Sequence, residues 1–343
     1  MIYRAKAPLR ISFCGGGTDV SPYPEERGGV VLSATINRYA FASLHPLRKP
    51  ILRLRSLDFD ETVEADLTGS LELDGRCDLL KGVVGYFRDE RDGEGLPSGL
   101  EILSHTDAPP GSGLGASSTM VTTLVGVCQE WLRIPLAPYD IAELTYHIER
   151  ERVRISGGRQ DQYAAVFGGF NFIEFHRDHT IVNPLRIRRD TQNELESRLL
   201  LVYSGQTRLS ARIVERQTRS YQQRKSAVVE ALDAMKELAI RMKNELLRDD
   251  LDAFGRLLHE AWLHKKQLDS GISNTHIDAL YEEARRLGAL GGKILGAGGG
   301  GYLLLYCPYE EKHRIAEALR DKGGQPAGFA LEGRGLQTWA VRR

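Results

Sequence analysis

Long apolar runs are scarce in this sequence of 343 residues. The longest are short stretches such as "YLLLYC" (residues 302–307), whereas a membrane-spanning helix needs about 20 apolar residues. The first residues, "MIYRAKAPLRISF", also lack the apolar centre of a secretory signal. We therefore expect no spanning helix and a cytoplasmic protein.

Cysteine is rare, and charge of one sign is not in excess. The four cysteines (Cys14, Cys77, Cys128 and Cys307) are far apart and form no Cys-x-x-Cys pair, which disfavours a disulfide framework or a zinc ribbon. Basic and acidic residues each number 46, so the formal net charge is zero. A balanced chain of this kind is a poor candidate for bulk binding to nucleic acid or to an anionic membrane.

Glycine is abundant instead, with 36 residues, and much of it is clustered. The clusters are residues 15–17, the alternating Gly111, Gly113 and Gly115, and eight glycines between residues 288 and 301. Each glycine in regular structure costs about 0.5–1 kcal/mol relative to alanine. Clusters of this size are therefore expected where the backbone needs positive φ or must approach a ligand closely.

The pattern along the chain predicts an α+β protein with two domains. The segments near residues 10–16, 28–44 and 51–65 indicate strands, and the 3–4 spacing of apolar residues over 117–132 indicates a helix. A long helical region covers 220–268, with a break near "RDDLDAF" (248–254). We place the boundary near residue 190, which gives domains of residues 1–190 and 191–343.

The segment "PPGSGLGASS" (109–118) is typical of a phosphate-binding loop, because free backbone N–H groups converge at the start of a helix. The common P-loop pattern does not occur. The dinucleotide pattern G-x-G-x-x-[GA] occurs twice by letter, but the first copy has a proline pair at the turn and the second leads into a strand. The more specific pattern P-x-G-x-G-L-G-x-S fits Pro109 to Ser117.

Three segments in order, "APLRISFCGGGTD", "PPGSGLGASS" and "GGKILGAGGGGYLLLY", resemble the motifs of the GHMP kinases. The resemblance implies a two-domain fold: an N-terminal, ribosomal-protein-like nucleotide-binding domain and a C-terminal, ferredoxin-like, helix-rich domain. It also implies ATP and Mg²⁺ as cofactors. Within the family, "GGRQDQYAAVFGGFNF" and "SGQTRLSARIV" resemble the sugar-phosphate branch.

The resemblance implies roles for individual residues. Asp161 would steer or accept the proton of the sugar hydroxyl, and Arg10 would stabilise charge on the transferring phosphoryl group. The nucleotide would contact Pro110, Gly111, Ser112, Gly113, Leu114, Gly115, Ala116, Ser117 and Ser118. Mg²⁺ would be held by Ser117 and Glu149, with Ser118 and Glu151 as rivals. From the residues alone, a cap at the start of a short helix is the favoured role of Asp161, and the family motif reverses that preference.

The sugar would contact Gly17, Thr18, Asp19, Arg159, Thr207, Arg208, Ser210, Gly298 and Gly299. Thr207, Arg208, Ser210 and Arg212 form a plausible cradle for a second phosphate, with Arg159 and Lys293 as rivals. The implied reaction moves the γ-phosphate of ATP to the anomeric hydroxyl of a sugar phosphate, and D-glycero-D-manno-heptose 7-phosphate is favoured. Fucose or another sugar, and an inactive ligand-binding regulator, are the alternatives; the partners would be small molecules, with a homodimer allowed.

Overall fold

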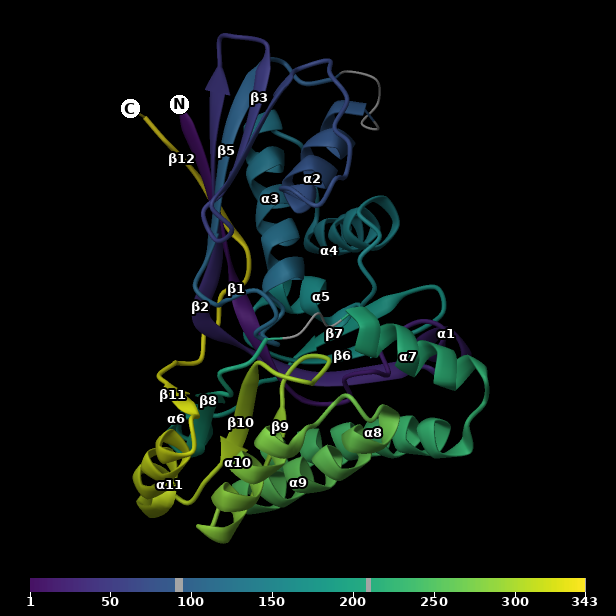
Figure 1. Ribbon diagram of the computed structural model, residues 1–343, viewed down its shortest axis with the longest axis vertical. Coiled ribbons are helices and arrows are strands. Elements are labelled where there is room, and N and C mark those ends of the chain that lie inside the picture. Colours follow the sequence, from purple (N-terminus) through teal and green to yellow (C-terminus); the bar gives the residue numbers. More distant parts are fainter. Residues whose placement is uncertain (90–94, 208–210, 343) are drawn as a thin grey trace.

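The computed structural model describes residues 1–89, 95–207 and 211–342. Its first half is built on an eight-stranded sheet with the order β12-β1-β2-β5-β3-β4, in which β2 also pairs with β6, and β6 with β7 (Figure 1). Every pair is antiparallel except β3 with β5. The strands are β1 (Ile2–Cys14), β2 (Gly29–Leu47), β3 (Ile51–Ser56), β4 (Glu61–Asp66), β5 (Gly99–Thr106), β6 (Phe170–Phe175), β7 (Thr180–Pro184) and β12 (Gln337–Val341).

Helices cover one face of this sheet (Figure 1). Their apolar side chains, from Val83 and Phe87 to Val121 and Leu124, form one buried core with the strands. The helices of this half are α1 (Tyr23–Arg27), α2 (Asp78–Asp89), α3 (Ala116–Leu132), α4 (Pro138–His147) and α5 (Gln160–Phe167). A π-helical turn, Ile148–Arg152, continues α4.

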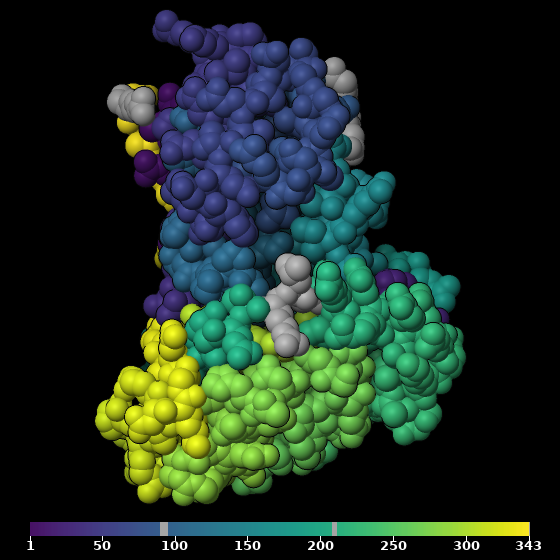
Figure 2. All heavy atoms as spheres, in the orientation of Figure 1, coloured from purple at the N-terminus to yellow at the C-terminus, as the bar shows by residue number. Residues whose placement is uncertain are grey.

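The second half contains a four-stranded antiparallel sheet with the order β11-β8-β10-β9. Its strands are β8 (Leu199–Tyr203), β9 (Gly291–Ile294), β10 (Tyr302–Tyr306) and β11 (Gln325–Ala327). Its helices are α6 (Arg189–Arg198), α7 (Ala211–Gln222), α8 (Ser226–Leu247), α9 (Leu251–Leu268), α10 (Thr275–Arg286) and α11 (Tyr309–Asp321). Figure 2 shows the two halves as separate lobes on one face, purple to blue above and green to yellow below.

Strand β1 joins the two halves. Its end carries Leu9, Ile11 and Phe13 into a core that also contains Met242 of α8 and Phe254 of α9. The ring of Phe13 meets that of Phe254 edge to face, with centroids 5.2 Å apart. Burial of these large side chains stabilises the contact between the halves by about 25 cal/mol per Å² of apolar surface. We call this shared core the floor between the halves. The pocket described below opens above that floor.

The α+β prediction is confirmed, and the helices expected over 117–132 and 220–268 appear as α3 and as α8 with α9. The predicted boundary near residue 190 falls at the start of α6 and stays a prediction. A single boundary does not separate the two sheets, because the last strand, β12, pairs with β1 and so belongs to the first sheet. No helix among the described residues is long and apolar enough to cross a membrane.

Candidate active site

The glycine loop "PPGSGLGASS" leads from β5 into α3, as its sequence indicates. Gly111, Gly113 and Gly115 all have positive φ (74°, 83° and 76°), which L-residues rarely adopt. Gly115 is the N-cap of α3, and no side chain caps that helix. The first-turn amides of α3 therefore point at the loop, where they form an anion-binding end with the helix dipole.

Close neighbours also leave too little room for a side chain at two of these glycines. A Cβ at Gly113 would lie 2.6 Å from the carbonyl oxygen of Leu295, in the third glycine segment. A Cβ at Gly115 would lie 3.1 Å from the carboxylate of Asp161. The loop thus packs against both the third motif and the predicted catalytic residue, so three distant parts of the sequence meet here.

Arg10 and Asp161 form an ion pair at this junction. Nε of Arg10 donates to Oδ1 of Asp161 at 2.7 Å, and Nη2 lies at the same distance from that oxygen. Nη1 donates to the carbonyl of Gly113 at 2.6 Å. The side chains are 4% and 19% exposed, respectively, so the pair is largely shielded from solvent yet reaches the pocket. One guanidinium therefore fixes both the carboxylate and the glycine loop.

The predicted metal ligands lie together at the start of α3. Oγ of Ser117 donates to Oε1 of Glu149 at 2.9 Å, and Nε2 of Gln162 donates to Oε2 at 2.8 Å. Glu149 is 1% exposed, whereas its rival Glu151 is 66% exposed and pairs with His147. Ser118, the rival of Ser117, is buried and its Oγ accepts a hydrogen bond from Gln162. Of the two glutamates, only Glu149 lines the pocket.

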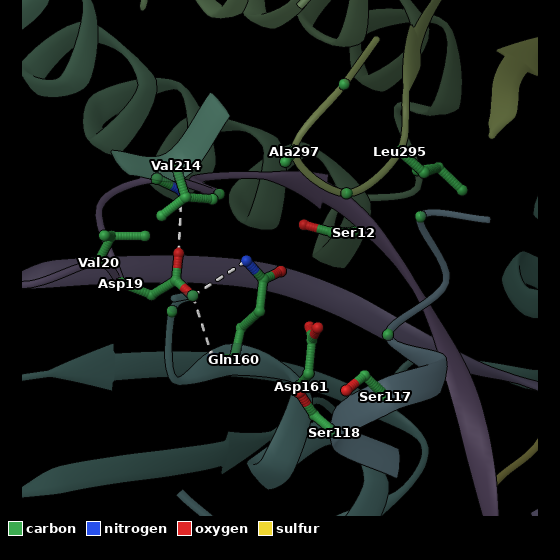
Figure 3. A pocket seen from close by; sticks show the side chains of 18 of the residues that line it. Ser12, Asp19, Val20, Ser117, Ser118, Gln160, Asp161, Val214, Leu295 and Ala297 are labelled. Atoms are coloured by element: carbon green, nitrogen blue, oxygen red, sulfur yellow. Dashed lines mark hydrogen bonds between the residues drawn. The ribbon is translucent and has the colours of Figure 1, made fainter. Parts of the chain in front are cut away.

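Asp19 closes the other side of the pocket and organises its own surroundings. Its carboxylate accepts hydrogen bonds from the backbone N–H of Gly17 (2.9 Å) and from both the backbone N–H and Nε2 of Gln160 (3.1 Å each). Figure 3 shows Asp19 and Gln160 facing each other beside Asp161 and Ser117. The loop after β1 is therefore tied to the segment that carries Asp161.

Two buried lysines lie under the pocket. Nζ of Lys265 donates to the carbonyls of Ile294 (2.9 Å) and Gly296 (2.5 Å), and Nζ of Lys293 donates to the carbonyl of Ser12 (2.9 Å). Burial lowers the pKa of Lys293 to about 8, and it lowers the pKa of Lys265 well below its usual value, helped by the charge of Lys293. Below about pH 8 Lys293 carries a positive charge, which makes the floor attractive to an anion.

Sequence reasoning missed Lys265, although a signal exists. On α9 it follows Leu258, Ala261 and Trp262 at helical spacing and precedes Leu268, so a lysine occupies an apolar stripe. Five further polar residues of the described chain line the pocket without having been singled out, namely Ser12, Arg150, Ser156, Gln160 and Gln217. Ser12 Oγ and Gln160 Oε1 are buried and have no hydrogen-bond partner among the described residues, as expected of groups that face a ligand.

Together these residues line one pocket of about 1140 Å³, a volume that includes solvent at its mouth. Of the predicted residues, the structure brings together Arg10, Gly17, Asp19, Gly111, Ser112, Gly113, Gly115, Ala116, Ser117, Ser118, Glu149, Asp161 and Gly298. The set spans both halves of the chain and combines an anion-binding loop, a shielded Arg–Asp pair and carboxylate oxygens. Such a set can bind a polyphosphate and position a hydroxyl next to it.

Several predicted contacts are not brought into this pocket. Thr18 is fully buried, and its hydroxyl is occupied by the backbone of Gly15 and Val30. Arg159 pairs with Glu25 at 3.1 Å instead. Pro110, Leu114, Thr207 and Gly299 also lie outside the pocket lining. Arg208 and Ser210 lie outside the described residues.

Comparisons with known proteins identify the family. The family description "GHMP kinases N terminal domain" matches residues 78–169, and "GHMP kinases C terminal" matches residues 242–325. The chain is 37% identical over 339 residues to the D-glycero-alpha-D-manno-heptose 7-phosphate kinase of Campylobacter jejuni, with 98% of this chain and 99% of that one covered. It is 29% identical to the L-fucokinase/L-fucose-1-P guanylyltransferase of Bacteroides fragilis, over 95% of this chain but 37% of that one.

Solved structures give the same result. A D-glycero-D-manno-heptose 1-phosphate kinase from Bacteroides thetaiotaomicron superposes with a TM-score of 0.83 at 35% identity, with 99% of this chain and 100% of that chain covered. Lactococcus lactis galactokinase shares the fold, with a TM-score of 0.77 at 18% identity over 98% of this chain and 95% of that one. Fold, pocket and relatives define an ATP-dependent phosphotransferase that acts on small molecules. The chain belongs to the GHMP kinase family.

Proposed function

We propose that this protein transfers the γ-phosphate of ATP to the anomeric hydroxyl of D-glycero-D-manno-heptose 7-phosphate, forming the 1,7-bisphosphate and ADP. The shielded pair of Arg10 and Asp161 beside the glycine loop is the observation that carries the proposal. The substrate is suggested by the relative from Campylobacter jejuni, which is named for it and matches along almost the whole chain. The product would feed the synthesis of nucleotide-activated heptose.

Asp161 would receive the proton of the C1 hydroxyl while the hydroxyl oxygen bonds to the γ-phosphorus and the bond to the β-phosphate oxygen breaks. Arg10 holds this carboxylate in place through two nitrogens and reaches the glycine loop with a third, so its positive charge would lie beside the negative charge that spreads during transfer. The loop amides and the start of α3 would hold the phosphates of ATP. Phosphoryl transfer needs mainly this positioning and charge stabilisation.

The oxygens of Ser117 and Glu149 fit a magnesium ion. Both are hard donors, and Mg²⁺ usually takes one or two protein ligands while water and phosphate oxygens complete its shell. Within residues 1–89, 95–207 and 211–342, no cluster of three or more histidine, cysteine or acidic side chains could hold a metal. When bound, the ion would neutralise the phosphates of ATP. Gln162 and Arg150 orient the Glu149 carboxylate toward Ser117.

The sugar would lie between Asp161 and the loop that Asp19 organises. The buried Oγ of Ser12 and Oε1 of Gln160 are available as hydrogen-bond partners for its hydroxyls. Asp19 already accepts three hydrogen bonds, so its main contribution is to hold Gly17 and Gln160 in place. Its position in the lining leaves room for one further contact with a polyol.

The test is ADP formation from MgATP with four sugars offered separately: heptose 7-phosphate, heptose 1-phosphate, unphosphorylated heptose and L-fucose. We expect turnover with the 7-phosphate and a product phosphorylated at C1. Preference for the 1-phosphate would move the reaction to the other end of the sugar, as the name of the Bacteroides thetaiotaomicron relative suggests. Turnover of fucose alone would replace the substrate, and no turnover at all would favour the regulator alternative.

A cytoplasmic location and a homodimer stay predictions. The four cysteines are free and buried in the structure, as they would be in a reducing compartment. Fractionation of cells and light scattering of the purified protein test the two predictions separately.

A further inference from the structure

A second hollow continues from the active-site pocket. We call it the side groove; it encloses about 910 Å³, again including solvent at its mouth. The residues that line both hollows are Val20, Arg150, Ile155, Ser156, Gly157 and Val214. One wall is the loop after the π-helical turn, and the other is α7, so the groove lies between the two halves of the chain.

The side groove carries more positive than negative charge. Arg150, Arg154 and Arg219 line it against a single carboxylate, that of Glu215, which accepts a hydrogen bond from Ser156. Arg154 and Arg219 are exposed, and their guanidinium groups form no ion pair or hydrogen bond with any side chain or carbonyl in the described part of the chain. Two unpaired guanidinium groups along one groove, opposed by a single carboxylate, indicate a place for an anion.

The loop that presents Arg154 is held in a defined conformation. Arg150 donates to the carbonyls of Ile155 (3.0 Å) and Gly158 (2.9 Å), so its guanidinium serves the loop rather than a ligand. Arg154 itself has a φ of 63°, in the left-handed region. A bulky residue there costs about 1–3 kcal/mol, and such positions cluster at functional sites.

The side groove opens at the end of the pocket away from the nucleotide loop. In Figure 3, Val20 and Val214 stand beyond Asp19, at the end away from Ser117 and the nucleotide loop. Gly157, at the rim of the groove, precedes Asp161 by four residues, a span of at most about 14 Å of chain. A sugar with its reacting hydroxyl at Asp161 would therefore extend past Asp19 toward the groove.

We propose that the side groove binds the phosphate of the substrate that is not transferred, with Arg154 on one wall and Arg219 on the other. The hydroxyls of Ser21 and Thr218 line the same groove and can donate to the remaining phosphate oxygens. This inference rests on the proposed function, because it assumes a substrate that carries a phosphate far from the reacting hydroxyl. It moves the second anion site away from the predicted cradle, whose Thr207 lies outside the pocket.

The experiment compares Arg154→Gln and Arg219→Gln with wild-type protein on heptose 7-phosphate and on unphosphorylated heptose. Each variant is expected to raise KM for the phosphorylated sugar about tenfold to a hundredfold, while kcat, KM for ATP and all constants with unphosphorylated heptose stay unchanged. Arg224→Gln is the matched control, since Arg224 follows the same helix and pairs with Glu26 instead of facing the groove. Arg212→Gln tests the predicted cradle.

Equal losses on both sugars, no loss in either variant, or a loss in Arg212→Gln alone would overturn the side-groove assignment. Failure of the proposed function gives a different result, namely no turnover of heptose 7-phosphate by wild-type protein. In that case calorimetric titration with the same sugar phosphate decides the question. Binding by wild-type protein that both groove variants lose supports the groove; binding that they keep, or no binding by wild-type protein, overturns it.

Discussion

Arg10 and Asp161 are 151 residues apart in the chain, yet Nε of Arg10 donates to Oδ1 of Asp161 at 2.7 Å. The same guanidinium donates to the carbonyl of Gly113. A single side chain from β1 therefore aligns the carboxylate at the start of α5 with the loop at the start of α3. This relationship connects the first two sequence motifs with the segment that carries the predicted catalytic aspartate.

Replacement of Asp161 by asparagine tests that carboxylate. We expect kcat to fall about 10²–10⁴-fold, because the variant cannot accept the hydroxyl proton. ATP affinity should be retained, since the glycine loop is untouched. Steady-state kinetics and calorimetric titration with ATP check this, with the melting temperature as a control for folding. Native kcat in the variant would contradict the catalytic role.

The pair Glu149→Gln and Glu151→Gln separates the two rival metal ligands. Glu149 is buried against Ser117, while Glu151 is exposed and paired with His147. We expect Glu149→Gln to raise the Mg²⁺ concentration needed for half-maximal activity by tenfold or more, about the effect of one lost charged ligand contact. Glu151→Gln should behave like wild-type protein. Similar magnesium titrations for both variants would contradict the metal assignment.

Two glycines with the same backbone strain test the close approach at the loop. Gly115 has a φ of 76°, and a Cβ added there would lie 3.1 Å from the Asp161 carboxylate, whereas Gly75 has a φ of 92° and no neighbour within 4 Å of an added Cβ. Alanine at either position should cost about 1 kcal/mol of stability through φ. Only Gly115→Ala should also lower kcat, by displacing Asp161. Chemical denaturation and kinetics on both variants separate strain from displacement.

Stability should depend on pH through Lys293. Its pKa in the folded protein is about 8, against an ordinary value of 10.5, because the side chain is buried. Between these values the unfolded chain holds the proton and the folded chain does not, so unfolding free energy rises with pH. As the pH rises from 8 to 10.5, the unfolding free energy of wild-type protein should increase by about 3 kcal/mol relative to that of Lys293→Met. Below pH 8 the difference between the two proteins should not change with pH.

The measurement is the difference between the two unfolding free energies, obtained by urea denaturation at several pH values. Groups that do not interact with Lys293 titrate alike in both proteins and cancel in the difference. Lys265 does interact with Lys293, so the same pair of proteins is also measured in a Lys265→Met background. A difference that stays constant from pH 7 to 10.5 would show that Lys293 keeps its proton in the folded protein. A difference that changes in the opposite direction would place its folded pKa above the ordinary value.

Much of the site was readable in the sequence, because glycine loops and helix starts are local features. The alternating Gly111, Gly113 and Gly115 predicted the anion-binding turn, and all three have positive φ. Local sequence features could not decide whether Glu149 or Glu151 faces the pocket. Residues two apart on a helix point about 200° from each other, so one had to face away, but the direction of the pocket was unknown.

The sequence by itself determined the family, the order of the elements and the loops, since these follow from periodicity, glycine positions and three spaced motifs. Tertiary structure decided which side chains meet. It paired Arg10 with Asp161, buried Lys265 and Lys293 beneath the pocket, and returned β12 to the first sheet. It also opened the side groove between α7 and the loop after Arg152. These relationships join residues distant in the chain, and they depend on packing between the two halves, which no local pattern encodes.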